Sequence, residues 1–288
     1  MLLLVGMAVP CFANVRLVDH GAPQADVVVA VQATGDERQA ADELVRYVKK
    51  ATGATLAIRS EPVRGRATIL IGPNVAPAAI RAKLAALSGD GYLVEAKGDT
   101  LVLAGKGRDG TSYAVYEFLD HFAGVRWLWP GELGEIVPAR KSLVVEDVSL
   151  AKEPAFVWRF LGPGGALWNH HDRWSKEREL GVSAEHAATQ ARWEKRNRFG
   201  GENIYGGHAF GEILPPSVYG PTHPEYFALV KGERQWRKFD GKHNCQPCTS
   251  NPEVVAKVVE YCLQRFAVHP DLDGVSIGMN DGRGFCEC

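Results

Sequence analysis

The chain has 288 residues, of which 45% are hydrophobic and 23% charged, and its formal net charge is −1. These values are typical of a globular protein, and the length allows about two domains. The 33 basic and 34 acidic residues include no basic block, which disfavours nucleic acid as a partner.

The N-terminus indicates a destination outside the cytoplasm. Residues 2–9 form an apolar run with the length of a signal-peptide core, and Pro10 and a small-residue exit at 11–13 follow it. This run is too short for a transmembrane span. No basic residue precedes it, so we interpret residues 1–13 as a signal peptide that lacks its first residues. Acylation of Cys11 is the weaker alternative. We therefore expect a secreted or periplasmic protein.

Residues 15–150 are expected to form an α+β sandwich domain, in which two or three helices cover one mixed sheet. The helix predicted at 36–51 has Asp36 and Gln39 in capping-box spacing and Gly53 just past its end. Gly98 and Asp99 separate two alternating segments, which predicts a β-hairpin. The other elements predicted are strands at 26–31, 67–72 and 125–129, and helices at 76–87 and 113–122.

Three glycines in this domain match the G-x-G-x-x-G pattern of dinucleotide-binding turns: Gly105, Gly107 and Gly110. In dinucleotide-binding folds this turn follows the first strand in a run of βαβ units. Here it follows the hairpin, near the end of the domain. We therefore predict that the glycines permit a tight turn into a helix and bind no dinucleotide.

From residue 156 onward, strands and helices are predicted to alternate. Strands are predicted at 156–160, 203–205 and 273–279, and a helix is predicted to begin at a capping box, Ser250–Glu253, with Pro252 in its first turn. This order predicts a (β/α)8 barrel of the TIM type. Because closing such a barrel takes about 250 residues, residues 156–288 would be its N-terminal half, truncated at the C-terminus. We therefore expect the chain to be a fragment that is inactive by itself.

Five cysteines follow the predicted signal peptide. Cys262 lies on the apolar stripe of its predicted helix, where it is expected to be a small core residue. The other four, Cys245, Cys248, Cys286 and Cys288, supply as many sulfurs as a structural zinc site with four cysteine ligands requires. In an oxidising compartment disulfides are the more common outcome, and structural zinc is the alternative. Under either interpretation we expect Cys248 and Cys286, with Cys288 beside them, to lie close together.

Asp281 is the candidate catalytic residue. It follows a predicted barrel strand, and barrel enzymes assemble their sites at the carboxyl ends of their strands. Asn280, beside it, is a candidate ligand for an acetamide or hydroxyl group of a substrate. The alternative is that Asp281 belongs to an Asp-Gly turn or caps a following helix.

Three more residues are candidate substrate ligands. Arg159 ends the first predicted barrel strand, Trp168 lies in a glycine-rich loop, and His208 follows the second strand. An arginine can bind a sugar hydroxyl or carboxylate, and an aromatic plane can pack on a sugar ring. The alternatives are an ordinary salt bridge for Arg159 and core packing for Trp168. Because His170 and His171 are adjacent, they do not present two ligands to one metal from a helix face, and no metal is assigned to them.

The order of these motifs resembles known glycosidases. Segments 40–53, 69–72, 110–119 and 126–131 resemble the accessory N-terminal domain of α-glucuronidases and family 20 hexosaminidases. The second half resembles the barrel of the "domain of unknown function 4838" proteins, some of which are classed as glycoside hydrolase family 163, through segments 193–198, 208–216, 223–227, 248–253 and 280–288.

This resemblance covers nearly the whole chain. It implies a secreted glycoside hydrolase that acts on N-acetylhexosamine-containing glycans. Such hydrolysis needs an acid and a second carboxylate, or an acid and the substrate's own acetamide. The alternative is a non-catalytic carbohydrate-binding protein on the same scaffold.

Overall fold

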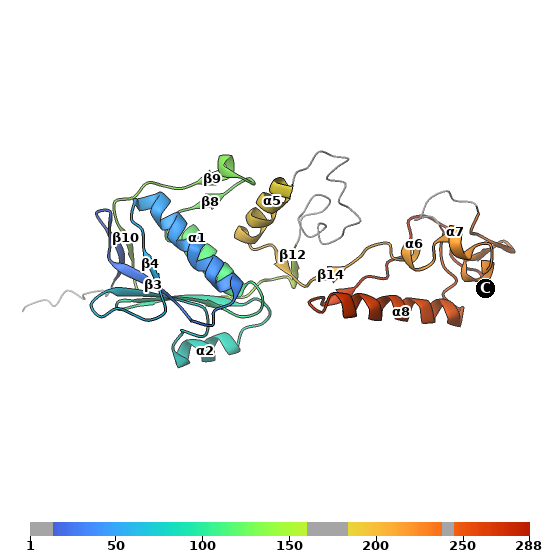
Figure 1. Ribbon diagram of the computed structural model, residues 1–288, viewed down its shortest axis with the longest axis horizontal. Helices are drawn as coiled ribbons and strands as arrows, with labels where there is room; N and C mark the ends of the chain where they lie inside the picture. The colour runs from blue at the N-terminus through green and yellow to red at the C-terminus, as the bar shows by residue number, and fades with distance from the viewer. Residues whose placement is uncertain (1–13, 160–183, 238–244) are drawn as a thin grey trace, which may run out of the picture. The chain divides into compact units, whose positions relative to one another are not determined.

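The computed structural model describes residues 14–159, 184–237 and 245–288, and it divides into two compact units at Gly201 (Figure 1). The predicted signal peptide at 1–13 lies outside the described residues. So do Trp168, His170 and His171.

The first unit is built on a six-stranded mixed sheet with the strand order β11-β6-β7-β5-β3-β4. β4, β3, β5 and β7 pair with one another in parallel, whereas β6 pairs antiparallel with β7, and β11 pairs antiparallel with β6. All five positions of β3 are buried, which is typical of a strand covered on both faces. The strands are β3 (Ala25–Val29), β4 (Ala57–Arg59), β5 (Ala67–Ile71), β6 (Tyr92–Lys97), β7 (Thr100–Gly105) and β11 (Val148–Lys152).

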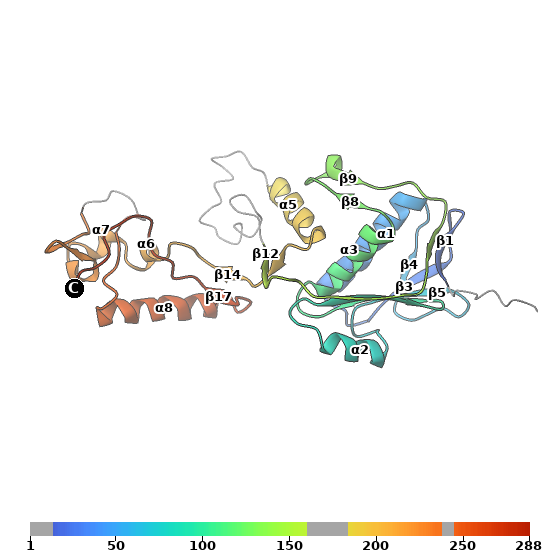
Figure 2. The same cartoon turned by 180° about the vertical axis from the view of Figure 1, so that it is seen from behind.

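Helices cover both faces of this sheet. α1 (Gly35–Thr52) and α3 (Gly110–His121) pack on one face and α2 (Ala78–Ala85) on the other, as Figures 1 and 2 show from opposite sides. The capping box of α1 lies two residues before the predicted one, because Thr34 and Glu37 form it in place of Asp36 and Gln39. Threonine supplies a short hydroxyl that reaches the N3 amide. Gly53 ends the helix in the left-handed conformation, as predicted.

The predicted hairpin and glycine turn are both confirmed. β6 and β7 pair antiparallel around Gly98, whose φ is +65°. A Cβ atom on Gly105 would lie 2.0 Å from the carbonyl carbon of Gly110, so the strand end and the helix start touch backbone to backbone. Only glycine permits this approach.

Short strands complete the edges of the first unit. β1, β2 and β10 form a three-stranded sheet, and β8 pairs with β9. Their bounds are β1 (Val15–Asp19), β2 (Ala22–Pro23), β8 (Arg126–Trp127), β9 (Glu135–Ile136) and β10 (Leu143–Val145), and a short 3-10 helix, η1 (Glu132–Gly134), lies between β8 and β9.

Residues 158–159 and 184–201 also belong to the first unit. α5 (Ala184–Arg196) is held there because Arg196 Nε donates to Glu43 (2.9 Å) and its NH1 group donates to Glu135 (3.0 Å). The predicted first barrel strand, 156–160, is reduced to β12 (Trp158–Arg159), which pairs antiparallel with β13 (Gly200–Gly201). The domain limits at 150 and 156 stay predictions, and the compact division of the chain falls later.

The second unit contains one parallel pair of strands, β14 (Ile204–Tyr205) and β17 (Gly274–Val275), and an isolated bridge between His208 and Gly278 extends it. β15 and β16 pair antiparallel. These four strands are the ones that the structure describes in this unit, and they do not establish a barrel. The other elements of the unit are α6 (Phe210–Ile213), α7 (Pro216–Tyr219), η3 (Pro224–Tyr226), β15 (Leu229–Val230), β16 (Glu233–Arg234) and α8 (Pro252–Val268).

α8 differs from its prediction at its start and on its surface. Asn251, not Ser250, caps the helix, because the Asn251 side chain accepts a hydrogen bond from the Glu253 amide (2.9 Å). Val254 is buried, whereas Val255 is 50% exposed and Leu263 is 64% exposed. The predicted strand at 273–279 is likewise shortened to β17. Among the described helices, none has the length and apolar character needed to cross a lipid bilayer.

Candidate functional site

His208 and Asp281 meet beyond the carboxyl ends of the two parallel strands of the second unit. β14 leads into His208 and β17 leads into Asp281, and the bridge between His208 and Gly278 keeps the two segments in register. His208 Nε2 lies 3.2 Å from Asp281 Oδ1. The Asp281 side chain is 78% exposed and that of His208 is 41% exposed. The pair therefore faces solvent.

Two contacts hold the His208 ring. Its Nδ1 atom lies within hydrogen-bond distance of the Met279 carbonyl oxygen, and its Nε2 atom faces the Asp281 carboxyl group. An imidazole and a carboxyl group are both able to give or take a proton. The pair thus brings two proton-transferring groups together at an exposed position.

Asn280 points the other way, into the interior. It is buried, and its Nδ2 atom donates to the Cys245 carbonyl oxygen (2.5 Å). Gln246 Nε2 donates to the Asn280 carbonyl oxygen (2.7 Å). The Asn280 side chain therefore ties the loop after β17 to the segment 245–246. Its role as a substrate ligand stays a prediction.

Arg159 belongs to the first unit, where its guanidinium group is held by several neighbours. It donates to the carbonyl oxygens of Phe156 (2.6 Å) and Arg198 (2.8 Å) and to the Tyr113 hydroxyl (3.2 Å), and it pairs with Asp90 (3.5 Å). These contacts give it a structural role there. A shared site with His208 and Asp281 stays a prediction.

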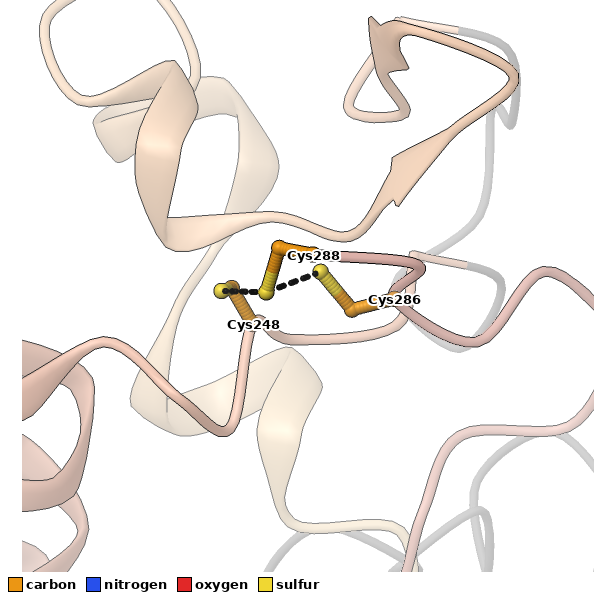
Figure 3. Close-up of side chains that lie close together, drawn as sticks. All are labelled: Cys248, Cys286 and Cys288. Carbon is orange, nitrogen blue, oxygen red and sulfur yellow. Dashed lines mark hydrogen bonds between the residues drawn. The ribbon is translucent and has the colours of Figure 1, made fainter.

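Three cysteines of the second unit converge, as expected from the sequence. Cys288 Sγ lies 3.6 Å from Cys248 Sγ and 3.3 Å from Cys286 Sγ (Figure 3). Cys245 is not part of this group, and its buried thiol donates to the Trp236 carbonyl oxygen (3.6 Å). The candidate set of four sulfurs is therefore corrected to three. Cys262 is half-buried on α8 and stands apart from the group.

Two thiols of the group, those of Cys286 and Cys288, differ in acidity. Partial burial by itself would raise the pKa of Cys286, but hydrogen bonds with the backbone of Leu229 and Cys288, and then with the Cys288 and Cys248 side chains, lower this pKa to about 7. Ser250 lowers the pKa of Cys288, whereas the two neighbouring thiols raise it, and the net effect is upward. Burial raises the pKa of the Cys245 thiol. Of Cys286 and Cys288, Cys286 is thus the thiol that loses its proton more easily.

A second group of polar side chains surrounds the start of α8. His223 Nδ1 lies 3.0 Å from Glu225 Oε1, and Tyr226 donates its hydroxyl proton to Glu253 (2.5 Å). The bond to Glu253, first, and then burial raise the pKa of Tyr226 to about 12. These contacts give the group a structural role, in which it supports the loop before α8.

Sequence reasoning missed the residues that hold these sites in place. Gln246 contacts the Asn280 backbone, and Leu229 and Arg234 approach Cys286 at 3.2 and 4.0 Å. The position of Gln246 between the candidate ligands Cys245 and Cys248 was the one sequence feature that could have indicated its role. Leu229 acts through its backbone amide, so its side chain carried no information about this contact.

Comparisons with known proteins give two family matches. The family described as "Domain of unknown function (DUF4838)" matches residues 129–288, and the family described as "Glycosyl hydrolase family 67 N-terminus" matches residues 12–118. A search of curated protein sequences gives no match.

Several solved glycosidase structures are similar to part of the chain. A family GH115 4-O-methyl-α-glucuronidase with specificity for decorated arabinogalactans is 17% identical with a TM-score of 0.46, over 77% of this chain and 28% of that enzyme. A GH20 exo-β-N-acetylglucosaminidase from Vibrio harveyi is 14% identical with a TM-score of 0.30, over 51% and 18%. The N-acetyl-β-hexosaminidase of Streptomyces plicatus is 14% identical with a TM-score of 0.33, over 51% and 24%.

The chain therefore spans less than a third of the length of each of these three enzymes. The match to the DUF4838 family covers more than half of the chain. Residues 12–118, before that region, match the family 67 N-terminal domain, and the protein thus belongs to the DUF4838 family.

Proposed function

We propose that this protein is a glycoside hydrolase that acts on N-acetylhexosamine-containing glycans, and that Asp281 transfers a proton in the reaction. The observation that carries the proposal is the exposed pair of His208 and Asp281, 3.2 Å apart, beyond the carboxyl ends of β14 and β17. Catalytic residues of barrel enzymes gather at this end of parallel strands. The preceding domain of the glycosidase type supports the same interpretation.

The chemistry of the pair fits an acid–base role. In glycoside hydrolysis a carboxylic acid protonates the leaving oxygen, and the same group can later take a proton from water. In the proposed mechanism Asp281 gives and later takes this proton, and the contact with His208 holds its carboxyl group in position. When the substrate carries an acetamide, that acetamide supplies the nucleophile, so the protein need not provide a second carboxylate for that purpose. An N-acetylated sugar is therefore the substrate that best suits a site with one assigned carboxylate.

Two architectural proposals belong with this function. β14 and β17 are parallel, and α8 lies between them in the chain, after α6, α7, η3, β15 and β16; we assign this crossover to a (β/α)8 barrel of which these residues form part. The apolar segment 2–9 supports a secreted or periplasmic location. Both agree with a protein that meets glycans outside the cytoplasm.

The test replaces the carboxyl group without changing its size. In the full-length protein, Asp281→Asn is expected to lower hydrolysis of an N-acetylglucosaminide by roughly 10²-fold or more, the scale of losing an acid–base group. Glu260→Gln, an exposed carboxylate on α8, is the matched control and should retain wild-type turnover. Unchanged turnover in Asp281→Asn would remove the assignment.

A second measurement separates hydrolysis from binding alone. Titration of the wild-type protein with N-acetylglucosamine oligosaccharides, followed by NMR, reports binding without turnover. Binding with no hydrolysis of any N-acetylglucosaminide by the full-length protein would favour the carbohydrate-binding alternative. The solvent exposure of Asp281 is the observation that favours this alternative.

A further inference from the structure

Three thiols from two distant segments of the second unit meet at one point. Cys248 precedes α8, whereas Cys286 and Cys288 lie about forty residues later, in the loop after β17. Their sulfur atoms all lie within 4.8 Å of one another. Figure 3 shows the three sulfur atoms side by side, with that of Cys288 between those of Cys248 and Cys286. Chain connectivity alone would not bring Cys248 to this point, so the fold places it there.

The surroundings of these sulfurs suit thiolates. The Leu229 amide donates to Cys286 Sγ (3.2 Å), and the Arg234 guanidinium approaches the same sulfur at 4.0 Å. Cys288 also has a hydrogen bond with Ser250. Such outer donors orient the ligands of metal–thiolate centres and stabilise their charge. Three thiolates around a divalent ion carry a net charge of −1, and Arg234 offsets that charge.

We propose that Cys248, Cys286 and Cys288 bind one zinc ion through their three sulfur atoms. Each thiol loses its proton to solvent and forms one S–Zn bond, so three protons are released and no electron is transferred. Zinc is four-coordinate in most protein sites. Water or one further donor completes the coordination. Thiolate ligands favour zinc over magnesium or calcium, which prefer oxygen.

A disulfide explains the geometry less completely. Joining any two of the three thiols consumes two electrons of an external oxidant and leaves the third sulfur unused. The convergence of all three sulfurs is what a metal requires. The two outcomes differ in stoichiometry, since a disulfide leaves one free thiol and zinc leaves none accessible.

Zinc at this position would fasten the loop that carries Asp281. Cys286 and Cys288 lie on that loop, and Cys248 directly precedes the Asn251 cap of α8. The metal therefore joins the end of the loop to the start of the helix. The role is a positioning one, and it holds whether or not Asp281 transfers a proton.

The experiment titrates the reduced, metal-free chain with Zn²⁺ and with Co²⁺. One Zn²⁺ per chain is expected by elemental analysis, together with a rise in the unfolding temperature. Co²⁺ should give thiolate charge-transfer bands and the visible bands of tetrahedral cobalt. Cys286→Ser should weaken Zn²⁺ binding by more than the roughly 10–100-fold that loss of an outer partner costs.

Two further variants guard against misfolding as an explanation. Cys262→Ser, outside the group, is the matched cysteine control and should bind Zn²⁺ like the wild type. Cys288→His replaces an exposed thiol by another zinc ligand and should retain binding while its charge-transfer band weakens. The proposal fails if the reduced wild-type chain binds no stoichiometric Zn²⁺, or if Cys286→Ser binds Zn²⁺ as tightly as Cys262→Ser.

Discussion

The two compact units bury their helices to very different extents. In α3 of the first unit, every residue from Gly110 to Leu119 is buried. In α8 of the second unit, Val254 is the buried residue, while Val258 and Tyr261 are half-covered. Both sequences show apolar residues at helical spacing. The comparison teaches that periodicity identifies an apolar face but does not determine what covers it.

The same contrast holds for charge. The first unit encloses carboxylates and surrounds them with cations, so that Glu117 meets Lys152 (2.5 Å) and Arg198 (2.9 Å). Glu135 is held in the same way by Lys50 (2.6 Å) and Arg196 (3.0 Å). In the second unit the pair of His208 and Asp281 is exposed. Enclosed pairs support the fold, whereas an exposed pair remains open to a substrate.

The largest expected effect comes from breaking the enclosed network. Arg196→Met keeps the side-chain volume but removes the charge that contacts Glu43 and Glu135, and it should lower the free energy of unfolding by about 3 kcal/mol. Arg192→Met, an exposed position on the same helix, is the control and should change it by less than about 0.5 kcal/mol. Urea denaturation measures both. Equal effects would show that α5 is not packed as described.

Acid should weaken the first unit through Glu117. Burial alone would raise its pKa, but hydrogen bonds from Lys152 and Tyr92 and the charge of Arg198 lower it. A carboxylate whose pKa is lowered by folding contributes its full stabilisation at pH values above its pKa in the unfolded chain, about 4.3. This stabilisation is lost as the pH falls through its pKa in the folded protein.

Glu117→Gln should therefore cost on the order of 2 kcal/mol at neutral pH and show a shallower loss of stability in acid. The exposed carboxylate of Glu146 provides the control, and Glu146→Gln should keep the wild-type slope. Thermal unfolding followed from about pH 6 to about pH 3 records both. A wild-type slope in Glu117→Gln would contradict the assignment.

The smallest expected effect comes from comparing a buried and an exposed valine on α8. Val254 and Val255 are neighbours of the same chemistry, but they are 1% and 50% exposed. Val254→Ala should cost about 1–2 kcal/mol of unfolding free energy, since it removes buried methyl groups. Val255→Ala should change it by less than about 0.5 kcal/mol. The reverse order would mean that the other face of α8 is the covered one.

Much of the first unit could be predicted from its sequence because the signals there are local. The hairpin at Gly98 and the helix end at Gly53 depend on backbone conformations that glycine adopts readily. The first residue of α1 was harder to predict, since Thr34 and Asp36 are both suitable N-cap residues. The backbone conformation decides between them, and Thr34 is the one that is extended. The same ambiguity separates Ser250 from Asn251.

The candidate site was predictable in part. The convergence of Cys248 and Cys286 followed from the order of helix and strand between them, and the structure confirms it. The separation of Cys245 from the other three cysteines could not be predicted, because no sequence pattern indicates its hydrogen bond to the Trp236 carbonyl oxygen. The inward direction of Asn280 was equally hidden, since a strand end can turn either way once regular pairing stops.

The parallel pairing of Ile204 with Gly274 also dictates the order in which the molecule can assemble during synthesis. The hairpin of β6 and β7 can close as soon as it has been made, since few residues separate its strands. β14 must wait for about seventy more residues before its partner exists. A ribosome that makes about ten residues each second leaves it unpaired for several seconds. The first unit can complete its sheet within that interval, so it is expected to be folded while the second unit is still forming.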